Sequence, residues 1–134
     1  MFVIINLLRN VIGGFMLSTL DKNAVDNFLK LCKKEIKMGN RKFISLRKVV
    51  IKGSVMSAYD ALYNLGINDE KEMWNYILNL EVKDCIDVSF DYDASRDYNS
   101  EMYEFIIYIN NTKVYIKLTY RNKVICLSFH ESNY

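Results

Sequence analysis

The sequence predicts an α+β domain in which N-terminal helices pack on one face of a mostly antiparallel sheet. The first half of the 134-residue chain has apolar residues at helical spacing. In the last third, apolar residues alternate with polar ones between tight turns. The chain contains no proline and no Gly/Ser-rich linker. Residues 16–134 are therefore expected to form one domain around one core.

Helices and a strand are expected in the first half. Residues 21–37 predict an amphipathic helix that ends at Gly39. Residues 43–51 predict a strand, and residues 57–65 a short helix with Gly66 at its end.

A third helix is expected to start at Asn68, which would act as its N-cap ahead of three acidic residues. Its expected core residues are Met73, Ile77 and Leu80, with Trp74 packing beside them.

Strands dominate the second half. Residues 87–92 predict an edge strand, residues 93–100 a polar loop, and residues 101–109 a strand that turns at Asn110-Asn111. That turn would place Phe105 opposite Ile116 in the core and Glu104 opposite Lys117 on the other face.

The last two strands, residues 114–119 and 124–130, are expected to form a hairpin with Thr119 opposite Val124. Its core face would hold Val114, Ile116, Leu118, Ile125, Leu127 and Phe129. Its solvated face would hold Tyr115, Lys117, Thr119, Cys126, Ser128 and His130.

The segments V-Y-I-K-L and V-I-C-L-S-F-H of this hairpin resemble the MqsR family of bacterial toxins. The similarity extends upstream through A-L…L-G-I at residues 61–67 and I-L…L-E-V-K-D at residues 77–84, and covers roughly residues 17–134. It implies a RelE-like fold and an mRNA-cleaving endoribonuclease of a type II toxin–antitoxin system. It also implies an antitoxin protein as partner and no metal or nucleotide cofactor, and it leaves ribosome association open. A cytoplasmic location is expected separately, because the cysteine usage points to a reducing compartment.

Two catalytic positions are carried over from this resemblance, Tyr115 and His130. Lys117 matches the motif, and its catalytic role is inferred from chemistry: self-cleavage of RNA needs a base, an acid and a cation for the phosphorane. The alternative is that Lys117 only pairs with Glu104, Tyr115 only packs on the sheet, and His130 is a frayed strand end. The expected RNA-binding residues are Lys83, Arg96, Arg121 and Lys123.

Charge is unevenly distributed along the chain. Residues 20–53 hold ten Lys/Arg and three Asp/Glu (net +7), residues 54–110 hold three and twelve (net −9), and residues 111–134 hold four and one (net +3). The basic segments could face a polyanion, or they could simply be solvated. The three cysteines are an odd number without a C-x-x-C pair, so buried free thiols are expected rather than zinc ligands or disulfides.

Residues 1–15 are strongly apolar but too short and interrupted to span a membrane, and no membrane partner is expected. They are expected to be either a misassigned start or a helix that packs on the domain or a partner.

A second function remains open, because the chain contains no glutamine whereas characterised MqsR-like toxins use one. In that alternative, the same scaffold is a non-catalytic module that binds protein or RNA through a sheet edge and the basic helix.

Overall fold

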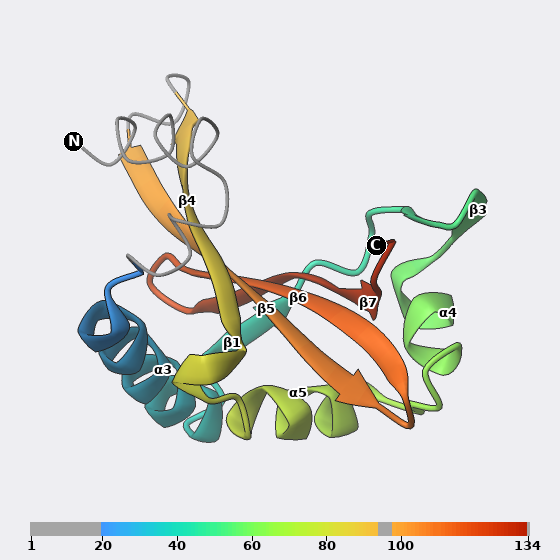
Figure 1. Cartoon of the computed structure of the whole chain (residues 1–134), viewed down its shortest axis with the longest axis horizontal. Coiled ribbons are helices and arrows are strands. Elements are labelled where there is room, and N and C mark those ends of the chain that lie inside the picture. The colour runs from blue at the N-terminus through green and yellow to red at the C-terminus, as the bar shows by residue number, and fades with distance from the viewer. Residues whose placement is uncertain (1–19, 94–97, 134) are drawn as a thin grey trace.

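The computed structural model describes residues 20–93 and 98–133 (Figure 1). The expected N-terminal extension and Arg96 lie outside these residues. In chain order the elements are α3 (Lys22–Lys37), β1 (Arg41–Phe43), β2 (Val49–Ile51), β3 (Ser54–Met56), α4 (Ala58–Tyr63), α5 (Glu70–Leu78), a 3₁₀ turn (Val82–Asp84), β4 (Cys85–Asp93), β5 (Tyr98–Ile109), β6 (Thr112–Tyr120) and β7 (Val124–Glu131).

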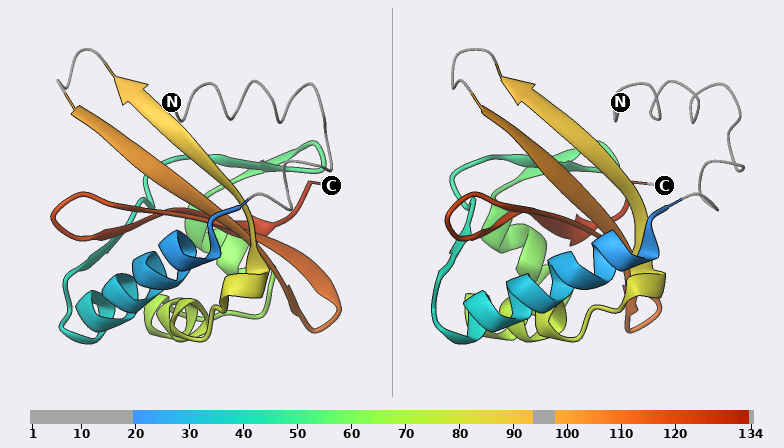
Figure 2. Two further views of the ribbon diagram at one scale, coloured as in Figure 1. Left: turned by 60° about the vertical axis from the view of Figure 1, so that its left-hand side comes forward. Right: turned by 90° about the vertical axis from the view of Figure 1, so that its left-hand side faces the viewer.

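Within the described residues, five strands form one sheet in the order β1-β7-β6-β5-β4, and β2 and β3 form a separate hairpin. β1 runs parallel to β7, and the other neighbouring strands are antiparallel. Helices α3 and α5 lie on one side of the sheet, and the β2–β3 hairpin rises on the side away from them (Figure 2). The predicted α+β class, with a mostly antiparallel sheet, is confirmed.

Helix α3 matches its prediction. The Asp21 carboxylate caps its start by accepting the Ala24 N–H at 3.1 Å. Gly39 follows its end with a φ of +83°, a conformation in which glycine carries no steric penalty. The predicted apolar stripe is buried: Val25, Phe28, Leu29, Cys32 and Ile36.

The prediction of one strand over residues 43–51 is wrong. β1 ends at Phe43, and the chain leaves the main sheet before β2 begins at Val49. β2 then turns back into β3 through Lys52 and Gly53, which both have positive φ (50° and 87°). Two such residues make the tight turn that joins antiparallel strands, so the apparent single strand is divided between two sheets.

Helix α5 is capped one residue later than expected. The Asp69 carboxylate, rather than the Asn68 side chain, accepts the Glu72 N–H at 2.9 Å. Asp and Asn are nearly equal as caps, so residue preference alone does not distinguish the two positions. The predicted core face is confirmed, because Met73, Trp74, Ile77 and Leu80 are each at most 1% exposed.

The β4–β5 hairpin is longer than predicted. Residues 98–100 belong to β5, so the predicted loop over residues 93–100 is wrong there. The backbone hydrogen bonds of β4 and β5 do not require alternating apolar side chains. Such alternation is not needed where the hairpin extends beyond the helices (Figure 1). Asn110 and Asn111, with φ of 50° and 67°, make the predicted turn into β6. The predicted pairs are confirmed, with Phe105 opposite Ile116 and Glu104 opposite Lys117.

The predicted register of β6 and β7 is wrong at the turn. Tyr120, not Thr119, pairs with Val124 across residues 121–123, and a bulge at Leu127 then shifts the ladder. Because a bulge adds one residue to one strand, the side chains before it lie on the opposite face from the one that simple alternation predicts.

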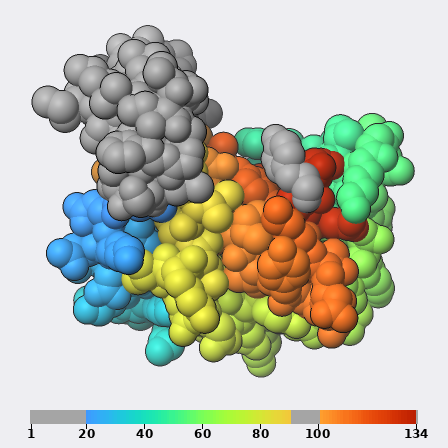
Figure 3. Space-filling view, in the orientation of Figure 1, coloured from blue at the N-terminus to red at the C-terminus, as the bar shows by residue number. Residues whose placement is uncertain are grey.

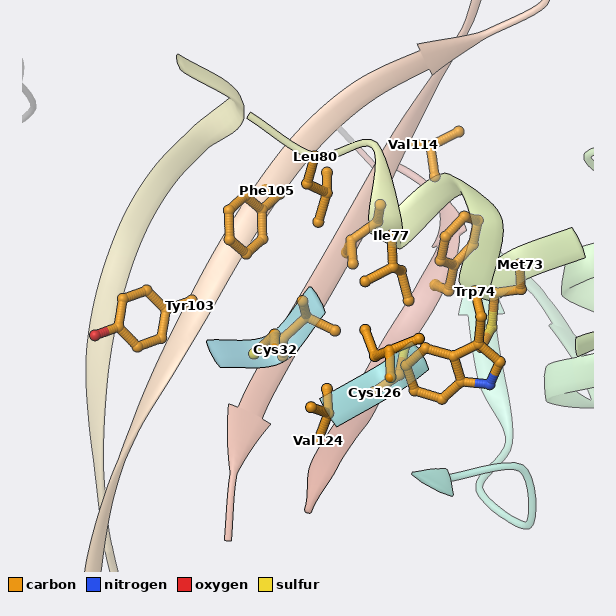
Figure 4. Close-up of a cluster of buried hydrophobic side chains, with 14 of the residues drawn as sticks. Cys32, Met73, Trp74, Ile77, Leu80, Tyr103, Phe105, Val114, Val124 and Cys126 are labelled. Carbon is orange, nitrogen blue, oxygen red and sulfur yellow. The ribbon is translucent and has the colours of Figure 1, made fainter. Parts of the chain in front are cut away.

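Cys126 is therefore wrongly placed by the prediction. It is 0% exposed and lies with Val124 among the core side chains of Trp74 and Ile77 (Figure 4). Ile125 and Leu127, predicted in the core, are only half-buried. Residues after the bulge keep their predicted faces: Phe129 is 2% exposed in the core, while Ser128 and His130 lie on the opposite face.

Candidate active site

Two of the predicted catalytic residues lie directly opposite each other in the sheet. Tyr115 on β6 pairs with His130 on β7, and their ring centroids are 5.6 Å apart at a tilt of 41°. Both side chains are half-buried on the face that points away from α3 and α5. The bulge at Leu127 produces this pairing, because it sets the register of the last four residues of β7.

The Tyr115 hydroxyl donates a hydrogen bond to Glu104 Oε1 at 2.6 Å. Glu104 comes from β5, so three adjacent strands contribute to the site. The phenolic oxygen can also accept a hydrogen bond from a substrate hydroxyl, and it could take up that proton as its own passes to Glu104.

Lys117 lies directly opposite Glu104 in the ladder. It forms no ion pair with any residue that the structure describes. The expected alternative, a Lys117–Glu104 pair, is therefore not formed, since the carboxylate bonds Tyr115 instead. Lys117 lies two residues from Tyr115 along β6, opposite Ser128, so its ammonium group adds positive charge to this face.

The His130 ring is oriented by the backbone. Its Nδ1 lies 2.7 Å from the Glu131 carbonyl oxygen. A carbonyl oxygen only accepts hydrogen bonds, so Nδ1 must carry the proton. In the neutral ring Nε2 then holds the lone pair, and in the charged ring it carries a proton that can be donated.

A hollow of about 150 Å³ opens beside His130. It exists because β1 ends at Phe43, so β7 has no strand on its outer side beyond Cys126 in the described part of the chain. Arg47 and Lys48, from the segment that leaves the sheet, line this hollow. Sequence reasoning did not single out these two residues as site residues. The signal available was only the net positive charge of residues 20–53.

The expected RNA-binding residues do not gather at this site. Lys83 lies in the 3₁₀ turn before β4, at the far edge of the sheet, and pairs with Glu81 Oε2 at 3.2 Å. Arg121 and Lys123 lie in the β6–β7 turn, at the opposite end of the hairpin from His130.

The cysteines are unsuited to be nucleophiles. Cys32, Cys85 and Cys126 are buried free thiols, as predicted. Burial raises the pKa of Cys32 to about 12. Burial also raises the pKa of Cys126, which lies in the core beneath this face. Thiols with such pKa values hold almost no thiolate near neutral pH.

No cluster of three or more His, Cys, Asp or Glu that could hold a metal ion occurs in residues 20–93 and 98–133. Among these residues, no helix is both long and apolar enough to cross a membrane. Comparisons with protein families, curated proteins and solved structures found no match to this chain. The MqsR resemblance therefore stays a prediction.

Proposed function

We propose that this protein is an endoribonuclease that cuts mRNA by attack of a 2′-hydroxyl on the adjacent phosphate, without a metal. The observation that carries the proposal is the Tyr115–His130 pair, backed by the Tyr115–Glu104 hydrogen bond. The pair supplies two groups that can exchange protons, on an accessible sheet face. The resemblance of the two strands to MqsR toxins supports the same reaction.

In the proposed reaction, Tyr115 accepts the proton of the 2′-hydroxyl while its own proton passes to Glu104. The O2′ atom then forms a bond to phosphorus, and the bond from phosphorus to O5′ breaks. Protonated His130 donates its Nε2 proton to the leaving O5′ atom. Lys117 stabilises the added negative charge of the phosphorane. The products are a 2′,3′-cyclic phosphate and a 5′-hydroxyl.

Biochemically, the proposal is tested with purified protein, labelled single-stranded RNA and a chelator. We expect cleavage that leaves a 2′,3′-cyclic phosphate, and no cleavage at a position that carries a 2′-deoxyribose. His130→Ala should slow cleavage by about 10²- to 10⁴-fold. Intact RNA in the presence of folded protein would refute the proposal.

In the cell, the proposed role is that of a cytoplasmic toxin neutralised by an antitoxin protein encoded next to it. Inducible expression should arrest growth, and co-expression of the neighbouring gene should restore it. Normal growth with verified soluble protein would argue against the toxin role.

The alternative, a non-catalytic binding module, is favoured by one feature. The β2–β3 hairpin and the segment before it expose large apolar side chains, with Leu46 98% and Val55 66% exposed. Exposed apolar residues that adjoin an open strand edge fit a protein partner. This reading predicts that His130→Ala leaves all measurable function unchanged, which separates it from the nuclease.

A further inference from the structure

The hollow beside His130 has a mixed lining of apolar and polar residues, with basic residues at its edge. Arg47 and Lys48 are exposed at its edge. Its apolar lining residues include Phe43, Val49, Ala58, Leu127 and Phe129, of which Phe43, Ala58 and Phe129 are buried. A bare phosphate prefers polar donors on all sides, whereas a flat base has apolar faces and polar edges, so the mixed lining favours a base.

The size of the hollow narrows the choice of ligand. Pockets that enclose a whole small molecule measure about 300–1,000 Å³. At about 150 Å³, this hollow can take one ring system, and the rest of a larger ligand would have to lie outside it. A polymer that inserts one base and leaves its backbone on the rim meets this requirement.

The hollow also adjoins the proposed active site. Ser128 and His130 line it and lie on the same face as Tyr115. Arg47 and Lys48 at the rim suit the phosphates of a strand that passes from the hollow to His130.

The wall of the hollow is tied to the end of β7. The Asn133 side chain accepts the Lys52 N–H at 2.8 Å and donates to the Val50 carbonyl at 3.0 Å. Lys52 Nζ also pairs with Glu131 Oε2 at 2.8 Å. The Asn133 side-chain amide thus bonds to the backbone at the end of β2 as the peptide group of a neighbouring strand would. The hairpin lies beside the end of β7 (Figure 3), so the hollow is formed before any ligand arrives.

We infer that this hollow holds one unstacked base of single-stranded RNA, next to the bond that is cut, while Arg47 and Lys48 contact the flanking phosphates. The inference rests on the proposed function, and it adds that the substrate is single-stranded. A base inside a duplex is stacked and paired on both sides, so the protein would select single strands.

The test uses a short single-stranded RNA that the parent protein cuts, made non-cleavable by a 2′-deoxyribose at the cut position. In a series of otherwise identical RNAs, each base in turn is replaced by an abasic nucleotide, and binding is measured. We expect one position next to the cut to weaken binding by roughly 5- to 150-fold, the range for one stacked base. The same RNA annealed to its complement should bind more weakly than the single strand.

A matched pair of variants links that base to the hollow. Val50 and Val55 face each other across the hairpin and are both exposed (54% and 66%), and of the two Val50 lines the hollow. Val50→Trp should block the mouth and remove the effect of the sensitive abasic position. Val55→Trp should preserve that effect.

The outcomes separate the two proposals. Equal binding of every abasic RNA would overturn the base-binding inference and leave the nuclease proposal standing. RNA that is bound but not cut would refute the nuclease proposal. An abasic scan over every position would then still test whether the hollow binds a base. Failure to bind any RNA would refute both.

Discussion

The two ends of the β6–β7 hairpin use their polar side chains differently. At the turn end, the Asn40 side chain donates to Glu35 Oε1 at 3.0 Å and to the Asn122 carbonyl at 2.9 Å. The Tyr120 hydroxyl donates to the same Glu35 oxygen at 2.9 Å. This network fastens the turn to the end of α3.

At the open end, polar groups remain available to solvent and ligands. Lys117 forms no ion pair within the described residues, and the His130 ring, which lies against Tyr115, is hydrogen-bonded through Nδ1 to the carbonyl of its neighbour Glu131. The comparison teaches that the same residue types can hold the fold at one end and be left for chemistry at the other. Sequence pattern alone does not tell the ends apart.

The sharpest test of this comparison uses two tyrosines of the same strand. Both Tyr115 and Tyr120 donate their hydroxyl to a glutamate, Glu104 and Glu35 respectively. Tyr115→Phe should slow RNA cleavage by about 10²- to 10⁴-fold with an unchanged melting temperature. Tyr120→Phe should leave cleavage near the parent rate. Equal losses of cleavage in both variants would erase the distinction between the ends.

At the open end, the buried inner face should contribute far more to stability than Tyr115 and His130 on the outer face. Phe129 is 2% exposed, so Phe129→Ala should lower the free energy of unfolding by about 3–5 kcal/mol through the cavity it leaves. The adjacent His130 is half-buried on the other face, and His130→Ala should change that free energy by less than about 0.5 kcal/mol. Chemical denaturation of both variants measures the contrast. A large destabilisation by His130→Ala would assign it a structural role.

Thr119 should behave as part of the turn end, although it lies on the outer face. It is 0% exposed, and its hydroxyl donates to the Glu101 carbonyl at 2.8 Å. Thr119→Val keeps the shape and removes this bond, so unfolding should become easier by about 1 kcal/mol. Cleavage should not change. A variant as stable as the parent would show that water replaces the hydroxyl.

The smallest expected effect is the pH dependence of the Glu35 network. Hydrogen bonds from Asn40 and Tyr120 lower the pKa of Glu35 below its ordinary 4.5. A lowered folded-state pKa gives stability that is present above the unfolded pKa and is lost as pH falls through the folded one. The melting temperature of Glu35→Gln should therefore lie slightly below that of the parent at pH 7. The gap should close as the pH falls below 4.5. A constant gap would mean that Glu35 acts through packing.

The sequence predicts a strand register only where a local motif is compatible with a single arrangement. Asn110-Asn111 is a strong turn signal, and it set the β5–β6 register correctly, including Glu104 opposite Lys117. In β7, by contrast, Val124, Ile125, Cys126 and Leu127 are all apolar. Either Val124 and Cys126 or Ile125 and Leu127 could face the core, so the sequence does not indicate the bulge.

The pairing of Tyr115 with His130 depends on that bulge, so their common face could be predicted but not their contact. Arg47 and Lys48 were missed for a different reason. Their place beside His130 follows from the end of β1 at Phe43 and the turn at Lys52-Gly53. Those are long-range consequences of how β1 pairs with β7, and no short motif encodes them.

The position of β7 in the sheet has a consequence for the timing of synthesis. β7 is the last of the described strands in sequence, yet it lies between β1 and β6 and pairs Arg41 with Val124. A nascent chain therefore exposes β1 and β6 without the strand that joins them until residues 124–131 have left the ribosome. The contact of His130 with Tyr115 forms in that same late event. If the protein cuts mRNA as proposed, this contact cannot act on the encoding message while the residues before 124 are being made.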